Sequence, residues 1–88
     1  MKEGILYTRK YGAVKLRLGE LMDRQGIKRG QLAKLIDVRF EVADKWYRGE
    51  VEKMDMDILS RICFVLECQP GDLLEYVKDD EGRQFENE

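Results

Sequence analysis

Two short amphipathic stretches, separated by a tight break, constrain the fold of this chain more than any other feature. In the first stretch, residues 32–36 place apolar side chains at helical spacing, and the pattern ends at Asp37. Aspartate tolerates the left-handed backbone conformation that a sharp turn requires. The second stretch, residues 38–48, is closed by Gly49, and glycine is typical of helix ends. The pattern predicts two short helices joined by a tight turn.

Two further helices are predicted on either side of this pair. From Ala13 the pattern becomes helical, and Gly26 stops it. The clearest apolar stripe of the chain lies within residues 56–66, and Asp55 precedes it as a plausible N-cap.

A fifth helix is predicted near the C-terminal end. Pro70 suits the first position of a short helix that carries Leu73, Leu74 and Val77. Five short helices and no visible repeat predict an all-α fold, in a chain of 88 residues that is large enough for one modest core.

The chain divides into three predicted parts. Residues 1–12 form an N-terminal arm with a basic pair, Arg9 and Lys10, and the alternatives for it are a short strand or a mobile tail. Residues 13–77 form the helical domain. Residues 78–88 are acidic and form a C-terminal tail that we expect to fray.

Charge is distributed unevenly between the two halves of the chain. Residues 1–49 hold 12 Lys or Arg and 6 Asp or Glu, a net charge of +6, whereas residues 50–88 hold 4 and 12, a net charge of −8. The whole-chain charge of −2 therefore hides a basic half and an acidic end. This asymmetry is compatible with a nucleic-acid partner, which the overall charge alone would disfavour.

Several classes of protein are disfavoured by composition. No apolar run approaches the roughly 20 residues of a membrane span, and the N-terminus lacks a signal-peptide core, so we expect a cytoplasmic protein without membrane association. With no His and only Cys63 and Cys68, a one-chain structural zinc site is not expected, nor is any other metal or cofactor. Cys63 falls on the apolar stripe, where a core position is its simplest interpretation. No nucleophile–base pair can be assembled, so we do not expect an enzyme.

A family resemblance appears in the middle section. The segment QLAKLIDVRFEVADKWYRG (31–49), followed by CQPGDLLEYV (68–77), resembles the helix-turn-helix of the Cro/cI-type (XRE-like) transcriptional regulators. The resemblance implies a compact five-helix, lambda-repressor-like DNA-binding fold over about residues 13–77. It also implies that Ala43 and Trp46 face the core. Two residues depart from the family pattern: Asp37 stands where the family usually has Gly, and Ala43 where it usually has Ile or Val.

The resemblance also implies which residues contact DNA bases. In this family the second helix of the motif enters the major groove. By position, the predicted base contacts are Arg39, Phe40, Glu41 and Lys45. Arg39 or Lys45 can donate to guanine, Glu41 can accept from the cytosine amine, and Phe40 can lie against a thymine methyl group.

Three basic residues are predicted phosphate contacts. Arg29 opens the first helix of the motif, where its charge and the helix N-terminus suit a phosphate, and Arg48 and Lys53 flank the far end of the second helix. Asp44 fits no base role easily, and we expect it to pair with Arg48 at spacing i, i+4.

The predicted function is that of a sequence-specific transcriptional regulator of double-stranded DNA, and specifically a repressor. We expect a homodimer on a near-palindromic site, with half-sites one helical turn apart. The segment from Leu73 to Phe85 is the first choice for the dimer surface. The alternative is a helix-turn-helix scaffold that binds a protein partner, as an antitoxin or co-regulator, with weak or no DNA binding. The acidic half of the chain and the acids on the second helix favour this alternative.

Overall fold

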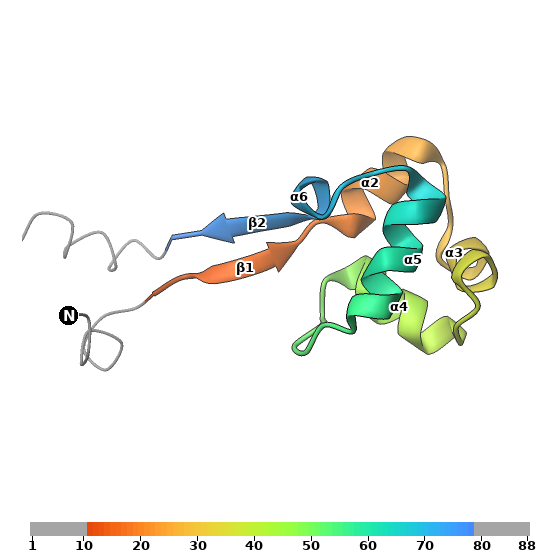
Figure 1. The fold of residues 1–88 in the computed structure, drawn as a ribbon, viewed down its shortest axis with the longest axis horizontal. Coiled ribbons are helices and arrows are strands. Elements are labelled where there is room, and N and C mark those ends of the chain that lie inside the picture. The colour runs from red at the N-terminus through yellow and green to blue at the C-terminus, as the bar shows by residue number, and fades with distance from the viewer. Residues whose placement is uncertain (1–10, 79–88) are drawn as a thin grey trace, which may run out of the picture.

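The structure, a computed structural model, describes residues 11–78, which form five helices and two short strands (Figure 1). In chain order the elements are β1 (Ala13–Leu16), α2 (Leu18–Gln25), α3 (Arg29–Ile36), α4 (Phe40–Arg48), α5 (Met56–Leu66), α6 (Pro70–Leu73) and β2 (Leu74–Val77). The prediction of five helices is confirmed. Because the predicted arm and tail lie mostly outside the described residues, as do Arg9, Lys10 and Phe85, the division into three parts stays a prediction.

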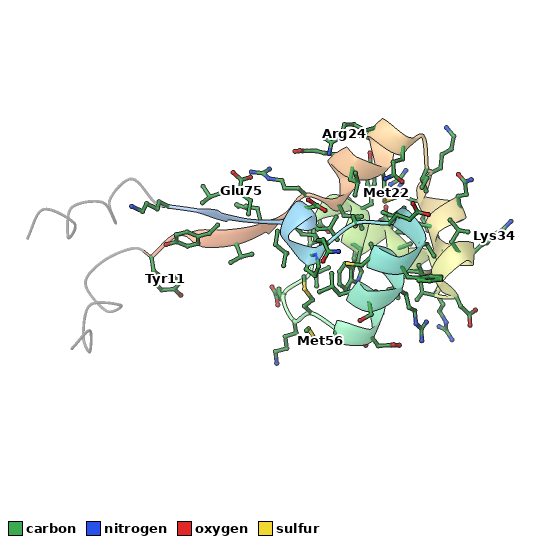
Figure 2. All side chains as sticks on the ribbon, turned by 45° about the horizontal axis from the view of Figure 1, so that its top comes forward. Tyr11, Met22, Arg24, Lys34, Met56 and Glu75 are labelled. Carbon is green, nitrogen blue, oxygen red and sulfur yellow. The ribbon has the colours of Figure 1, made fainter. Side chains whose placement is uncertain are left out.

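A two-stranded sheet joins the two ends of the described chain, so the prediction of an all-α fold is wrong in this respect. Strands β1 and β2 pair antiparallel, with Val14 opposite Tyr76 and Leu16 opposite Leu74. The resulting ribbon projects from one side of the helical body (Figure 1). Figure 2 shows Tyr11 at the outer end of this ribbon and Glu75 closer to the helical body, where it accepts from Arg17 at 2.9 Å.

The error has a physical reason at each end. The helical pattern predicted from Ala13 holds at Leu18 and Met22, which are fully buried on α2, but Val14 is 64% exposed and belongs to the strand. Residues four apart line up on a helix face, and residues two apart line up on a strand, so a short run satisfies both patterns. Pairing between the chain ends decides the outcome, and the aromatic and β-branched pair Tyr76–Val14 suits a strand.

The last helix is correspondingly shorter than predicted. Pro70 does take its first turn, as predicted, but α6 ends at Leu73. Leu74 and Val77, which we assigned to this helix, lie in β2 instead.

The core lies between the helices and is almost entirely apolar. Helix α5 supplies Leu59, Ile62 and Leu66, and Cys63 packs partly buried against the same cluster, as predicted. Figure 2 shows Met22 inside the helical body, with Arg24 and Lys34 pointing outward. The remaining buried apolar residues are Leu18, Met22, Leu32, Ala33, Ile36, Ala43, Trp46 and Leu73.

The turn between α3 and α4 has the backbone geometry that the sequence predicts. Asp37 adopts a left-handed conformation with φ of 59°, so aspartate does replace the usual glycine here. The Val38 N–H donates to the Ala33 carbonyl at 3.0 Å, which closes the end of α3. Arg61 of α5 donates from Nη1 to the Ile36 carbonyl at 2.8 Å and so satisfies another terminal acceptor of α3.

Caps and close approaches fix the other helices. Asp55 caps α5 as predicted, since its carboxylate accepts from the Asp57 and Ile58 amides at 2.8 and 3.3 Å. Helices α2 and α4 approach closely at Gly19, where an added Cβ would lie 2.6 Å from the Tyr47 carbonyl oxygen. The body thus holds α4 from two sides, by α3 and by α2.

Within residues 11–78, no helix is both long enough and apolar enough to cross a membrane.

Candidate nucleic-acid interface

Helix α4 turns one face into the core and the other face to the solvent. Ala43 is fully buried and Trp46 is 3% exposed, which confirms that these two residues anchor the helix. Trp46 supplies volume beside the small Ala43, whereas Phe40 remains 50% exposed. The body therefore fixes the orientation of α4 and leaves its other face accessible.

The four predicted base contacts all lie on the accessible side. Arg39 is the N-cap residue that precedes α4, and Phe40, Glu41 and Lys45 lie on the helix itself. All four are exposed. Arg39, Phe40 and Glu41 lie at the N-terminal end of α4, where a helix that enters the major groove presents its reading residues, whereas Lys45 lies in the last turn of the helix. Their contacts with bases stay predictions.

Asp44 is turned away from this exposed group and is 8% exposed. Its Oδ2 accepts from Arg48 Nε at 3.0 Å and Nη2 at 2.5 Å, as the i, i+4 spacing predicts. Its Oδ1 accepts from Arg29 Nη1 at 2.6 Å, which sequence spacing did not indicate. The hydrogen bonds from Arg48, together with the one from Arg29, hold the pKa of the Asp44 carboxyl below its usual value, although partial burial acts in the opposite direction.

Arg29 lies at the start of α3 and reaches across to α4. Besides its ion pair with Asp44, its guanidinium lies over two aromatic rings, 5.3 Å from the Tyr47 centroid and 5.8 Å from the Phe40 centroid. These distances fall within the range of cation–π attraction. Arg29 therefore connects the two helices of the motif and also contacts Phe40, one of the predicted base readers.

Arg48 closes the last turn of α4. Its pKa is raised, first by the hydrogen bond to Asp44. Its Nη1 lies 3.9 Å from a carboxylate oxygen of Glu50, a distance that indicates only a weak ion pair. Since its side chain is 54% exposed, Arg48 is paired and still accessible.

Tyr47 is a contributor that the sequence did not reveal. Its hydroxyl donates to Asp23 of α2 at 2.9 Å, and this hydrogen bond raises the pKa of the tyrosine. Its ring lies under Arg29. The sequence around Tyr47 does not indicate these contacts, because the two partners, Asp23 and Arg29, lie on other helices.

Lys53, the third predicted phosphate contact, lies apart from the two arginines. It lines a surface hollow with Lys45, but Glu50 and Glu52 line the same hollow. Two lysines and two glutamates offset each other there. Lys53 is therefore in a less basic environment than Arg29 and Arg48.

The arrangement of α3, a tight turn and an outward-facing α4 is a helix-turn-helix, and the class of protein that it defines is a DNA-binding domain. The chain belongs to the Cro/C1-type helix-turn-helix DNA-binding domain family, whose model matches residues 17–79. This confirms the resemblance seen in the sequence.

Two known proteins are similar to the chain. It is 34% identical over 67 residues to the uncharacterized HTH-type transcriptional regulator YozG of Bacillus subtilis (strain 168), and the match covers 76% of this chain and 67% of YozG. The crystal structure of the transcriptional regulator VanUg, form II, has a similar fold, with a TM-score of 0.62 and 23% sequence identity. This match covers 82% of the present chain and 95% of VanUg.

Proposed function

We propose that this protein is a transcriptional repressor that binds duplex DNA sequence-specifically through α4, and that it acts as a cytoplasmic, non-enzymatic homodimer. The observation that carries the proposal is the orientation of α4 in a Cro/C1-type domain. Buried Ala43 and Trp46 anchor the helix, and its polar residues face outward at the end that reads bases in such domains.

In this proposal the outward residues divide into two groups by their chemistry. Arg39, Phe40, Glu41 and Lys45 read base edges through hydrogen bonds and apolar contact. Arg29, Arg48 and Lys53 contact phosphates and set the position of the protein on the duplex.

The homodimer supplies two reading helices for two half-sites one helical turn apart. The predicted dimer surface needs one correction, because Leu73 is fully buried in the protomer, whereas Leu74–Val77 pairs with β1 along one edge only and remains a candidate. Leu73 therefore cannot contribute, and Phe85 lies outside the described residues. Analytical ultracentrifugation of the free protein and of its DNA complex measures the assembly state, with two protomers per duplex expected.

The experiment that tests DNA binding is selection from a random duplex pool, followed by titration of the selected operator at two salt concentrations. Counterion release predicts that a protein with several phosphate contacts loses affinity steeply, by at least tenfold, between about 50 and about 200 mM salt. A reporter gene behind the operator then measures repression. Failure to select any duplex, or an affinity that does not depend on salt, would refute the proposal.

A second candidate function is binding of a protein partner. The observation that favours it is an exposed apolar surface between α3 and α5, where Leu35 is 50% and Phe64 is 84% exposed on one shared hollow. Exposed apolar clusters on small domains commonly mark interaction sites. The variant Phe64→Ser separates the two functions, since it lies outside α4 and leaves DNA affinity unchanged if this surface serves only a protein.

A further inference from the structure

Asp44 is the one charged residue that is buried within residues 11–78, and it lies between the two helices of the helix-turn-helix. Acidic side chains are rarely buried unless they are paired. Here each carboxylate oxygen has its own arginine: Oδ1 accepts from Arg29 of α3, and Oδ2 accepts from Arg48 of α4. The carboxylate therefore joins the start of one helix to the end of the other.

This bridge brings two guanidinium groups to one point of the surface. Both Arg29 and Arg48 lie within 2.6 Å of the same carboxylate, so their charged groups are neighbours although the residues are far apart in sequence. Their side chains are 45% and 54% exposed, respectively. Each arginine is thus paired with Asp44 while its side chain stays partly exposed.

Both arginines retain donors for a second acceptor. A guanidinium carries five N–H donors, and in the described part of the chain Arg29 uses only Nη1 on Asp44. Arg48 uses Nε and Nη2 on Asp44, and its Nη1 makes only a 3.9 Å contact with Glu50. Two adjacent guanidinium groups of this kind suit a phosphate group, which accepts several charge-assisted hydrogen bonds at once.

The side chains are also ordered before any ligand arrives. An arginine loses considerable rotamer freedom when it binds, and this loss weakens binding. Here the ion pairs with Asp44 fix both guanidiniums, and the rings of Tyr47 and Phe40 hold Arg29 from another side. Much of the ordering is therefore complete in the free protein.

We propose that Asp44 is a positioning residue that holds Arg29 and Arg48 together as a single two-guanidinium clamp for one backbone phosphate of duplex DNA. The proposal rests on the proposed DNA-binding function and adds a role for an acid that no base contact explains. The cluster of the three side chains keeps a net charge of +1, so it still attracts a phosphate.

The proposal and simple charge counting predict opposite results for Asp44→Asn. Removal of a negative charge from a DNA-binding surface should tighten binding if the charge only repels phosphates. If Asp44 positions the arginines, the variant binds its operator about tenfold more weakly per half-site, and so about a hundredfold more weakly as a dimer, which corresponds to the loss of about one charge-assisted hydrogen bond per half-site. The slope of log affinity against log salt also becomes shallower by about one per half-site.

Glu50→Gln is the matched control. It removes the same charge close to Arg48, but Glu50 makes only the 3.9 Å contact. We expect its operator affinity to be unchanged or higher and its salt slope to be unchanged. Equal weakening in both variants would overturn the positioning role of Asp44.

Two further measurements distinguish the positioning role of Asp44 in DNA binding from a purely structural role in the fold. In an Arg29→Ala and Arg48→Ala background, Asp44→Asn should not lower operator affinity further, because no arginine is left to position, whereas general damage to the fold would still lower it. Arg48→Lys keeps the charge and the fold but loses the planar guanidinium group, so we expect a severalfold loss of operator affinity. Circular dichroism confirms that each variant is folded at the assay temperature.

The outcomes also distinguish a failure of the DNA-binding proposal from a failure of the clamp proposal. A wild-type protein that selects no duplex refutes DNA binding itself. A wild-type protein that binds its operator, with Asp44→Asn binding equally or more tightly, overturns only the clamp.

Discussion

Lys45 lies on the exposed face of α4, next to the buried Trp46, and is the proposed base contact with the simplest chemistry. Lys45→Ala should weaken binding to the selected operator by about 1–3 kcal/mol and relax discrimination at one base pair, because a lost base contact affects one position. Fluorescence anisotropy on the operator and its single-base variants measures both effects. Lys15→Ala on the projecting ribbon removes the same charge as a control. A uniform loss on all sequences would show that Lys45 contacts only phosphate.

Glu41 is the acidic residue that stays exposed on α4, in contrast to Asp44. We expect Glu41→Gln to change the preferred base more than the affinity, since a carboxylate that accepts from cytosine is selective for that base. Parallel selections with the wild type and the variant, from the same random duplex pool, provide the measurement. If the variant selects the same operator and binds all duplexes more tightly, Glu41 only repels phosphates.

The two ion pairs of Asp44 show which contacts of the site can be predicted from the sequence and which cannot. The Asp44–Arg48 pair follows from i, i+4 spacing within one helix, and the structure contains it. The Asp44–Arg29 pair and the ring of Tyr47 under Arg29 depend on how α3, α4 and α2 cross. Spacing along one helix carries no information about such crossings, so these contacts required the three-dimensional structure.

At the scale of the elements, the close crossing of α2 and α4 depends on Gly19, which has no side chain. Gly19→Ala should lower the free energy of unfolding by roughly 1–3 kcal/mol, because its Cβ would lie 2.6 Å from the Tyr47 carbonyl oxygen and would force the helices apart. Urea denaturation followed by circular dichroism measures the change.

Gly30 in α3 provides the matched control for Gly19. No atom lies within 4 Å of a Cβ added there, so Gly30→Ala should stabilise the protein by about 0.5–1 kcal/mol through helix propensity alone. Equal effects of the two variants would mean that α2 and α4 do not approach closely in solution.

The helices were more predictable than the strands because they are longer. A helix of eight or more residues repeats its apolar pattern and has its own start and stop signals, as the N-cap Asp55 and the C-cap Gly26 illustrate. Strands β1 and β2 have four residues each, and each is stabilised by a partner at the other end of the domain. A pattern this short fits a helix equally well, so the sequence alone led to an all-α interpretation.

At the scale of the whole molecule, the chain contains no histidine, and histidine is the residue whose unperturbed titration falls between pH 5 and 8. Perturbed groups among the described residues, Asp44 and Tyr47 among them, instead affect stability at the extremes of pH. The pKa of Asp44 is lowered from 3.8, so its stabilising effect is fully present above that value and is lost as the pH falls through the lower folded pKa. The pKa of Tyr47 is raised from 10.0, so its effect is present below pH 10.0 and is lost as the pH rises further.

We therefore expect stability to be nearly constant from about pH 5.5 to about pH 8 and to fall outside about pH 4 to 10. Urea denaturation across this range measures the profile, and variants assign its two ends. Asp44→Asn should remove part of the acid-side loss, because its amide does not titrate. Tyr47→Phe should remove part of the alkaline loss, because it lacks the hydroxyl that donates to Asp23. An acid limb that is identical in wild type and Asp44→Asn would mean that the carboxylate does not hold the two arginines in solution, and the clamp would then lose its structural basis.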